Sequence, residues 1–343
     1  MDRPGGFALG VNYPWLNYAE DFGVSPAGHF GLSLAQSRET VEREFAEIHE
    51  SGASVVRWFL FGDGRSGFLS EKGLPLGPDS LLLKDTAALL TLAERFGLKV
   101  CLSLIDYLWL EDRGDQRARH ANERVLQFAA GREAFLERVL IPMFSEFRAH
   151  AALFAWEISN EPEWAIKEFH RAARMHFADF RAFAREIACA VHEHAEVPVT
   201  LGSARLMWVR AWMELGLDFY QAHYYPAAEG ESTLAESLSA VERLDRPLWL
   251  GELPARDPSV PGYRLHDALN LCLDAGLSGA AVWRWTKPEA TGTDRAFGQV
   301  EPAALESWTS LRRGVTKTAC TPFPRRARSL RHASGISAMF AVK

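Results

Sequence analysis

Two glutamates, Glu161 and Glu252, stand where a pair of carboxyl groups could act on one substrate. Glu161 follows the apolar run Leu153–Ser159 within the tripeptide Asn-Glu-Pro, and Glu252 directly follows a second apolar run, Leu248–Gly251. Cleavage of a glycosidic bond needs an acid for the leaving oxygen and an anion for the oxocarbenium-like centre. Two carboxyl groups with different pKa values can fill both roles. The chemistry that this pair favours is glycoside hydrolysis.

Other polar and aromatic residues end apolar runs in the same way. They are Asn12 to Trp15, Arg57, Asp106, Asn160, His223 to Tyr225, and Trp283 to Trp285. The carboxyl ends of parallel strands meet at one edge of a sheet or one mouth of a barrel. We therefore expect these side chains to gather around the two glutamates.

The runs themselves predict eight strands. They are Ala8–Tyr13, Val55–Phe61, Val100–Ile105, Leu153–Ser159, Val199–Gly202, Phe219–Tyr224, Leu248–Gly251 and Ala280–Trp285. Segments with helical spacing of apolar residues lie between them. These are Glu39–Ser51, Leu81–Phe96, Arg132–Arg148, Arg171–His194, Met207–Leu215, Leu234–Leu244, Tyr263–Ala275 and Pro302–Arg313. Glycines such as Gly52, Gly97 and Gly276 mark helix ends.

Eight strands alternating with helices predict an α/β fold of the (β/α)8, or TIM-barrel, class in a single domain over residues 1–314. A doubly wound open sheet is the alternative, but the G-x-G-x-x-G motif expected after its first strand is absent. The glycine-rich stretch 62–67 lacks the Lys-Ser/Thr of a P-loop and is interpreted as a flexible loop. In a barrel, strands four and seven lie roughly opposite each other, so their glutamates can face across the mouth.

The ordered set of motifs resembles the clan A glycoside hydrolases, most nearly family 5. The set comprises Asn160-Glu161-Pro162, His223-Tyr224-Tyr225, Glu252 on the seventh strand and a tryptophan on the eighth, with Arg57 on the second. The resemblance covers the barrel, roughly residues 7–313. Asn-Glu-Pro alone is a weak motif, whereas the whole set in this order and spacing is far more specific.

The resemblance implies a retaining double displacement on a β-linked glucose- or mannose-type oligosaccharide or glycoside. Glu161 would be the general acid and then the base, and Glu252 the nucleophile. Asn160 would bind the sugar 2-hydroxyl, and His223 would line the site. Tyr225 and Arg57 would hold Glu252 ionised. Trp283 or Trp285 would form the floor beneath the sugar. Retention implies carboxyl groups ~5–5.5 Å apart.

One position departs from the family pattern. Many family members carry a histidine at the end of the third strand, where this chain has Asp106, which we expect to replace it in sugar binding. Trp15, in the loop after the first strand, is a further candidate platform for a sugar. Glu157 is interpreted as a buried carboxylate paired with a base, and Glu163 as a solvated residue.

The composition of the chain limits the classes of molecule that it is expected to bind. The 343 residues are 48% hydrophobic and 24% charged, with a net charge of −6, which argues against nucleic acid as the main partner. No apolar run approaches the ~20 residues of a membrane helix, and no signal peptide is visible, so a cytoplasmic location and small substrates cleaved by exo action are slightly favoured. No cofactor or metal is expected.

The basic segment 315–343, with six Lys or Arg and no acid, is predicted to be a flexible tail. The four cysteines are interpreted as buried core residues.

Two other functions fit the same residues. A transglycosylase would form the same covalent intermediate but pass the sugar to another sugar instead of water. A non-catalytic sugar-binding barrel would bind oligosaccharide without turnover, although binding alone gives no reason for two opposed glutamates. The sequence does not give the sugar, the linkage or the oligomeric state.

Overall fold

The computed structural model describes residues 6–110, 125–126, 128–171, 173, 175–226, 233–285 and 298–311. The predicted tail 315–343 and Cys320 lie outside the described residues. Among the described residues, no helix combines the length and the apolar character needed to cross a bilayer.

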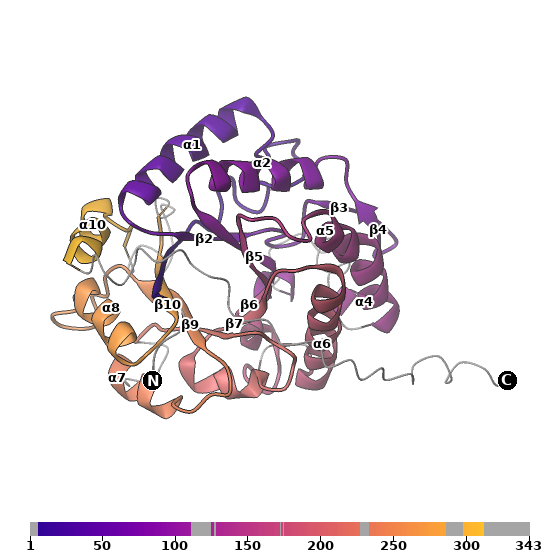
Figure 1. The fold of residues 1–343 in the computed structure, drawn as a ribbon. Helices are drawn as coiled ribbons and strands as arrows, with labels where there is room; N and C mark the ends of the chain where they lie inside the picture. Colours follow the sequence, from indigo (N-terminus) through magenta and orange to yellow (C-terminus); the bar gives the residue numbers. More distant parts are fainter. Residues whose placement is uncertain are drawn as a thin grey trace.

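Eight parallel strands close into a barrel with helices around it (Figure 1). The barrel strands are β1 (Ala8–Asn12), β2 (Val55–Phe59), β5 (Lys99–Asp106), β6 (Leu153–Asn160), β7 (Val199–Ser203), β8 (Tyr220–His223), β9 (Leu248–Pro254) and β10 (Gly279–Trp283). Their order around the barrel is β1-β10-β9-β8-β7-β6-β5-β2. The first and last strands pair, with Ala8 opposite Gly279. The predicted (β/α)8 class is confirmed, and the open doubly wound alternative is excluded because the sheet closes.

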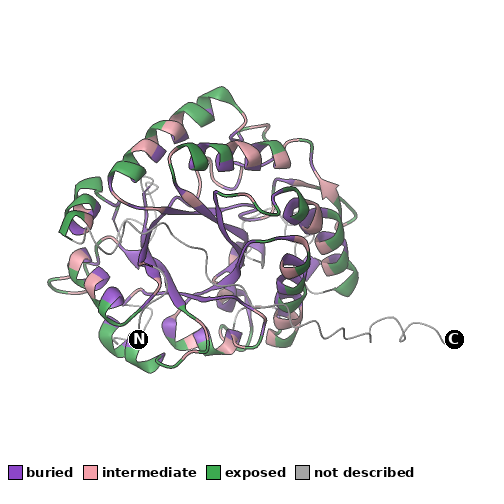
Figure 2. Cartoon of the chain, in the orientation of Figure 1, coloured by how far each residue is buried: buried purple, intermediate pink, exposed green. Residues whose placement is uncertain are grey.

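All eight predicted strands are present, and most bounds differ by one or two residues. Every residue of these strands is buried except Lys99, as expected for strands that are covered inside by other strands and outside by helices (Figure 2). β9 runs three residues beyond its predicted end, to Pro254, so Glu252 lies within the strand.

The helices bury the side that faces the barrel and expose the opposite side, as amphipathic helices do (Figure 2). They are α1 (Ala35–Glu50), α2 (Leu82–Arg95), α4 (Ala129–Phe135), α5 (Ile141–Glu146), α6 (Phe177–His194), α7 (Leu234–Ala240), α8 (Leu265–Asp274) and α10 (Pro302–Leu311). Short 3-10 turns are η1 (Tyr107–Leu110), η3 (Pro162–Ala165) and η4 (Leu206–Trp212). Gly52 follows α1 with a φ of 85°, the left-handed conformation of a helix stop.

Several predicted helices differ from the observed ones. The predicted helix Met207–Leu215 is the 3-10 turn η4, α1 begins at Ala35 instead of Glu39, and α7 ends at Ala240 instead of Leu244. The segment predicted as Arg132–Arg148 begins at Ala129, and a π-helical turn, η2 (Leu136–Leu140), separates α4 from α5. Pro142 has no N–H to donate to the preceding turn, so the regular helical ladder cannot pass through it. The segment predicted from Arg171 becomes helical only at Phe177.

The base of the barrel is filled by its own apolar cluster. This cluster comprises Ala8, Val55, Cys101, Phe154, Ala155, Phe219, Trp249 and Ala281. Cys101 and Cys272 are buried as predicted, whereas Cys189 is exposed on α6, so the interpretation as a core residue is wrong there. The filled base leaves the polar side chains above it as the barrel's functional layer.

One hairpin was not predicted. β3 (Phe68–Glu71) and β4 (Leu74–Pro78) form a two-stranded antiparallel sheet between β2 and α2. Its strands are short and largely outside the core, with prolines in β4 that weaken any strand pattern in the sequence.

Candidate active site

Glu161 is held at the mouth by an unusual backbone conformation. It follows β6 directly, and its φ of 45° and ψ of 48° lie in the left-handed region. Its backbone N–H donates to the carbonyl of Gly202 at 2.8 Å, and Pro162 then begins η3. A left-handed conformation costs a non-glycine residue about 1–3 kcal/mol, and such strain clusters at functional sites.

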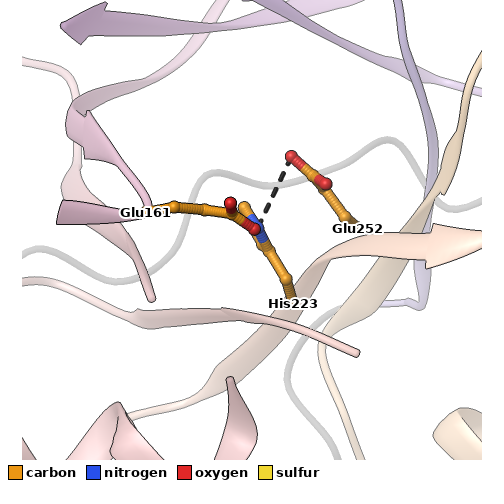
Figure 3. Close-up of side chains that lie close together, drawn as sticks. All are labelled: Glu161, His223 and Glu252. Carbon is orange, nitrogen blue, oxygen red and sulfur yellow. Dashed lines mark hydrogen bonds and ion pairs between the residues drawn. The ribbon is translucent and has the colours of Figure 1, made fainter. Parts of the chain in front are cut away.

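Glu252 faces Glu161 across the mouth, with His223 between them (Figure 3). One oxygen of each glutamate and one ring nitrogen of His223 lie within 4.8 Å of one another. Nδ1 of His223 is 2.8 Å from Oε1 of Glu161 and 3.5 Å from Oε1 of Glu252. The glutamate side chains are 15% and 5% exposed, so both can be reached from the mouth. The spacing is close to the ~5–5.5 Å of retaining glycosidases.

Arg57, on β2, makes hydrogen bonds to side chains of several other strands at the floor of the site. The side chain is fully buried, and five hydrogen bonds leave its guanidinium. Nε and Nη2 donate to the two oxygens of Glu157 at 2.6 Å each, and Nη2 also donates to Asn160 Oδ1 at 2.6 Å. Nη1 donates to Asn12 Oδ1 at 2.9 Å and to Glu252 Oε1 at 2.7 Å. A guanidinium has five N–H groups, so its donor capacity is used in full.

The predicted pairing of Glu157 with a base is confirmed. Burial alone would raise its pKa, but the bidentate contact with Arg57 holds the pKa of Glu157 below the ordinary value. Ser103 and Gln221 also donate to this carboxylate, at 3.1 Å and 2.9 Å. Glu157 is fully buried below the mouth, so it serves as a permanent counter-ion to Arg57 and not as a second acid.

The surroundings of Glu252 favour its ionised form more than those of Glu161. Burial raises the pKa of Glu252, while the charge of Arg57 and the hydrogen bond from Tyr225 lower it. Arg57 donates to Oε1, and the hydroxyl of Tyr225 donates to Oε2 at 2.7 Å. These contacts match the predicted placement of Arg57 and Tyr225.

Among the described residues, no Lys or Arg makes a hydrogen bond to Glu161. Its Oε2 accepts a hydrogen bond from the indole of Trp164 at 2.8 Å, and its Oε1 faces His223. Burial raises the pKa of Glu161 to about 7. Burial also lowers the pKa of His223 to about 4, so this ring is neutral at neutral pH. Of the two glutamates, Glu161 therefore has the surroundings that stabilise its anion less.

Asp106 lies beside Asn160 and holds it in place. Asp106 Oδ2 accepts from Asn160 Nδ2 at 2.8 Å, and Oδ1 accepts from the backbone N–H of Leu108 at 2.8 Å. Asp106 is 3% exposed, and burial raises its pKa to about 8. Its observed contacts are thus to the protein, with Asn160 between it and the reacting centre.

The predicted aromatic platforms fall in two places. Val11 on β1 pairs with Val282 on β10, so the next residues, Asn12 and Trp283, lie side by side. The side chain of Asn12 points into the barrel. Neighbours on adjacent parallel strands share a face, so Trp283 points inward as well. Trp285 and Trp15 instead line a cavity of about 600 Å³ beside α1, with Tyr13, Arg43 and Arg284. Neither Glu161 nor Glu252 is among the described residues that line this cavity.

Two features of the site escaped prediction. The contact between Trp164 and Glu161 spans three residues, but only the left-handed turn at Glu161 brings them together. The expectation that Glu163 is solvated is wrong: Glu163 is fully buried and accepts from Ser203, from the N–H of Ala204 and from the indole of Trp212. Glu163 anchors η3 beneath the mouth. Because it is fully buried, it does not compete with Glu161 as an acid.

Glu161, His223 and Glu252 are also the one group among the described residues whose atoms could ligate a metal ion. The guanidinium of Arg57 already donates to Glu252 at 2.7 Å, and a second cation beside it would be repelled. The group therefore suits an acid and a nucleophile better than a metal centre. That the protein needs no cofactor stays a prediction.

Comparisons with known proteins find similar sequences and similar folds. No known family model matches the chain. The chain is 23% identical, over 85% of its length and 86% of the relative, to a mannan endo-1,4-beta-mannosidase of Mytilus edulis. Its fold is similar to a beta-1,4-mannanase of Aplysia kurodai, with a TM-score of 0.72 and 20% identity over 94% of this chain and 99% of that one. An endo-1,4-beta-mannanase of Eisenia fetida gives a TM-score of 0.71 at 20% identity over 90% and 91% of the two chains.

The barrel and the facing glutamates define the class: this is a (β/α)8-barrel glycosidase that resembles the clan A, family 5-like hydrolases. The relatives that it matches are mannan-degrading enzymes of that kind.

Replacing Arg57 should damage the fold as well as the site. In Arg57→Met, the charge of Glu157 stays buried without its partner, because that carboxylate has no route to solvent. We expect the free energy of unfolding at neutral pH to fall by about 3–5 kcal/mol, measured by urea denaturation.

The control is an exposed arginine. Arg95 pairs with Glu42 at 2.7 Å, but the two side chains are 61% and 34% exposed, so Arg95→Met should cost less than about 1 kcal/mol. Adding Glu157→Leu to Arg57→Met should recover part of the loss. Equal losses for the Arg57 and Arg95 variants would contradict a structural role for the buried network.

Proposed function

We propose that this enzyme hydrolyses internal β-1,4 linkages of mannan-type polysaccharides with retention of configuration. The observation that carries the proposal is the facing pair of glutamates, with a guanidinium bound to Glu252 and only neutral groups in contact with Glu161. Such a difference in surroundings is how one site keeps an acid and an anion side by side.

In the first step, Glu161 is the acid and Glu252 the nucleophile. The carboxylate of Glu252 attacks the anomeric carbon, the bond to the glycosidic oxygen breaks, and the proton of Glu161 passes to that oxygen as the leaving sugar departs. Tyr225 and Arg57 orient the attacking carboxylate, and Asn160 offers its remaining amide hydrogen to the sugar 2-hydroxyl.

In the second step, Glu161 is ionised and acts as the base. It takes a proton from water, the water oxygen attacks the anomeric carbon, and the bond to Glu252 breaks to restore both side chains. Trp283 would form the floor of the sugar site. The same intermediate could pass the sugar to another sugar, so transglycosylation remains a property to measure.

The relatives guide the choice of substrate. The relative from Mytilus edulis and the structures from Aplysia kurodai and Eisenia fetida are named as endo-acting or β-1,4-mannan-cleaving enzymes. This supports mannose over glucose. It also supports internal cleavage over the exo action that the sequence slightly favoured.

Digestion of mannohexaose tests the function. We expect mannobiose, mannotriose and mannotetraose as early products, because internal bonds are cut, and the newly formed reducing ends should first appear as the β-anomer in ¹H NMR. Release of mannose alone would indicate exo action, and an initial α-anomer would contradict retention.

Variants of the two glutamates serve as controls for that assay. Glu252→Ala should lose at least about 10³-fold in kcat, and added azide should restore turnover of an activated substrate with an α-mannosyl azide product. Wild-type turnover in both Glu252→Ala and Glu161→Ala would falsify the assignment.

The pH dependence of kcat/KM should report the same pair. Above about pH 7 activity should fall, since Glu161 loses the proton it must donate. At low pH it should fall because Glu252 becomes protonated, and burial places this limb above the ordinary glutamate range. The measurement is kcat/KM for an aryl β-mannobioside across both limbs. A rate that stays constant well above pH 7 would contradict the role of Glu161.

A further inference from the structure

The indole of Trp164 makes a direct hydrogen bond to the proposed catalytic acid. Nε1 of Trp164 donates to Oε2 of Glu161 at 2.8 Å. The two residues belong to one tight turn, in which the backbone N–H of Trp164 also donates to the carbonyl oxygen of Glu161 at 3.2 Å. The left-handed backbone of Glu161 starts this turn, so the contact depends on a locally strained conformation.

A neighbouring arginine holds the indole in place. The guanidinium of Arg205 lies 5.3 Å from the ring of Trp164 and 4.3 Å from the ring of Trp208. The two indoles meet edge to face, with centroids 5.7 Å apart. Stacking of this kind stabilises the cation over both rings. Trp164 is therefore fixed by Arg205 just before η4, by Trp208 on η4 and by its own turn.

The two oxygens of Glu161 face different kinds of partner. An indole N–H can only donate a hydrogen bond, whereas a neutral imidazole nitrogen either donates or accepts, depending on its tautomer. Oε2 can thus accept from Trp164 whether Glu161 is ionised or protonated. Oε1 faces Nδ1 of His223 at 2.8 Å, and the direction of this contact depends on which ring nitrogen of His223 carries the hydrogen.

We propose that Trp164 is a positioning residue that keeps Oε2 as a hydrogen-bond acceptor, so that Oε1 carries the proton delivered to the leaving sugar. The inference rests on the proposed function, in which Glu161 is the acid and base. During cleavage the Oε1 proton moves to the glycosidic oxygen, which keeps the electron pair of its broken bond to the anomeric carbon, while Oε2 retains its indole partner.

Other charged or titratable groups surround Glu161, and a substitution at Trp164 removes none of them. They are Arg57 on β2, Asp106 on β5, Glu157 on β6, Arg205 before η4, His223 on β8 and Glu252 on β9. Burial raises the pKa of Glu161, and the Trp164 hydrogen bond is the foremost influence that lowers it. Removing the indole N–H should therefore raise this pKa further.

The test is Trp164→Phe, assayed on two aryl β-mannobiosides with different leaving groups. The basic limb of the kcat/KM profile should move up by about one pH unit, the size expected for one lost charge-assisted hydrogen bond. The phenyl glycoside needs acid assistance and should lose about 10- to 100-fold in kcat/KM. The 2,4-dinitrophenyl glycoside does not need it and should change less than about threefold.

Trp208→Phe is the matched control. It removes an indole from the same aromatic group, and its ring contacts Arg205 and Trp164 instead of Glu161. We expect its basic limb to stay at the wild-type position. An unshifted limb in Trp164→Phe, or equal losses on both glycosides, would overturn the proposal.

A second measurement covers the case in which Trp164→Phe does not fold. In wild-type enzyme with ¹⁵N-labelled indoles, one of the 11 tryptophan side-chain resonances should titrate with the pKa of the basic limb. That titration should vanish in Glu161→Gln. If no indole resonance follows the limb, the proposal fails, whereas the proposed function fails only if the glutamate variants keep wild-type turnover.

Discussion

The buried guanidinium of Arg57 organises the functional layer of this barrel. It meets Glu157 bidentately on one side and reaches Asn12, Asn160 and Glu252 on the other. A buried charge without partners is costly, so each contact restricts where the neighbouring strands can lie. The apolar cluster at the base of the barrel supports this layer from below.

Arg57 also creates the difference between the two glutamates at the mouth. Its charge is balanced first by Glu157, and the contact with Glu252 favours the anion there. Glu161 feels the charge of Arg57 but makes no hydrogen bond to it in the described structure, and its contacts are an indole and a neutral imidazole. A single cation placed asymmetrically thus gives one carboxyl group an anionic character and leaves the other with its proton. This difference is what a double displacement requires.

Much of this arrangement could be predicted from the sequence. Strands buried on both faces are nearly continuous apolar runs, so all eight were found, and the first polar residue after each run marked the mouth. The hairpin β3–β4 was missed because its short exposed strands carry no such pattern. The π-turn before Pro142 was missed because an apolar periodicity does not report a single extra residue.

Side-chain contacts were harder to predict than positions. The sequence placed Glu163 after a proline, which suggests a solvated helix start, but the turn directs it under η3 toward Ser203 and Trp212. Asp106 and Asn160 end neighbouring strands, yet only the barrel's register sets them face to face. The contact between Trp164 and Glu161 depends on one left-handed residue, which the local sequence does not reveal.

Covalent trapping gives the sharpest test of the proposed division of roles between the glutamates. A 2-deoxy-2-fluoro-β-mannosyl substrate with a dinitrophenyl leaving group should form the intermediate faster than water can release it. Mass spectrometry of the digested protein should then find the fluorosugar on the peptide that contains Glu252, bound through its carboxylate. A label on Glu161 or Glu157, or an active enzyme that hydrolyses this substrate without any labelled peptide, would contradict the roles assigned here.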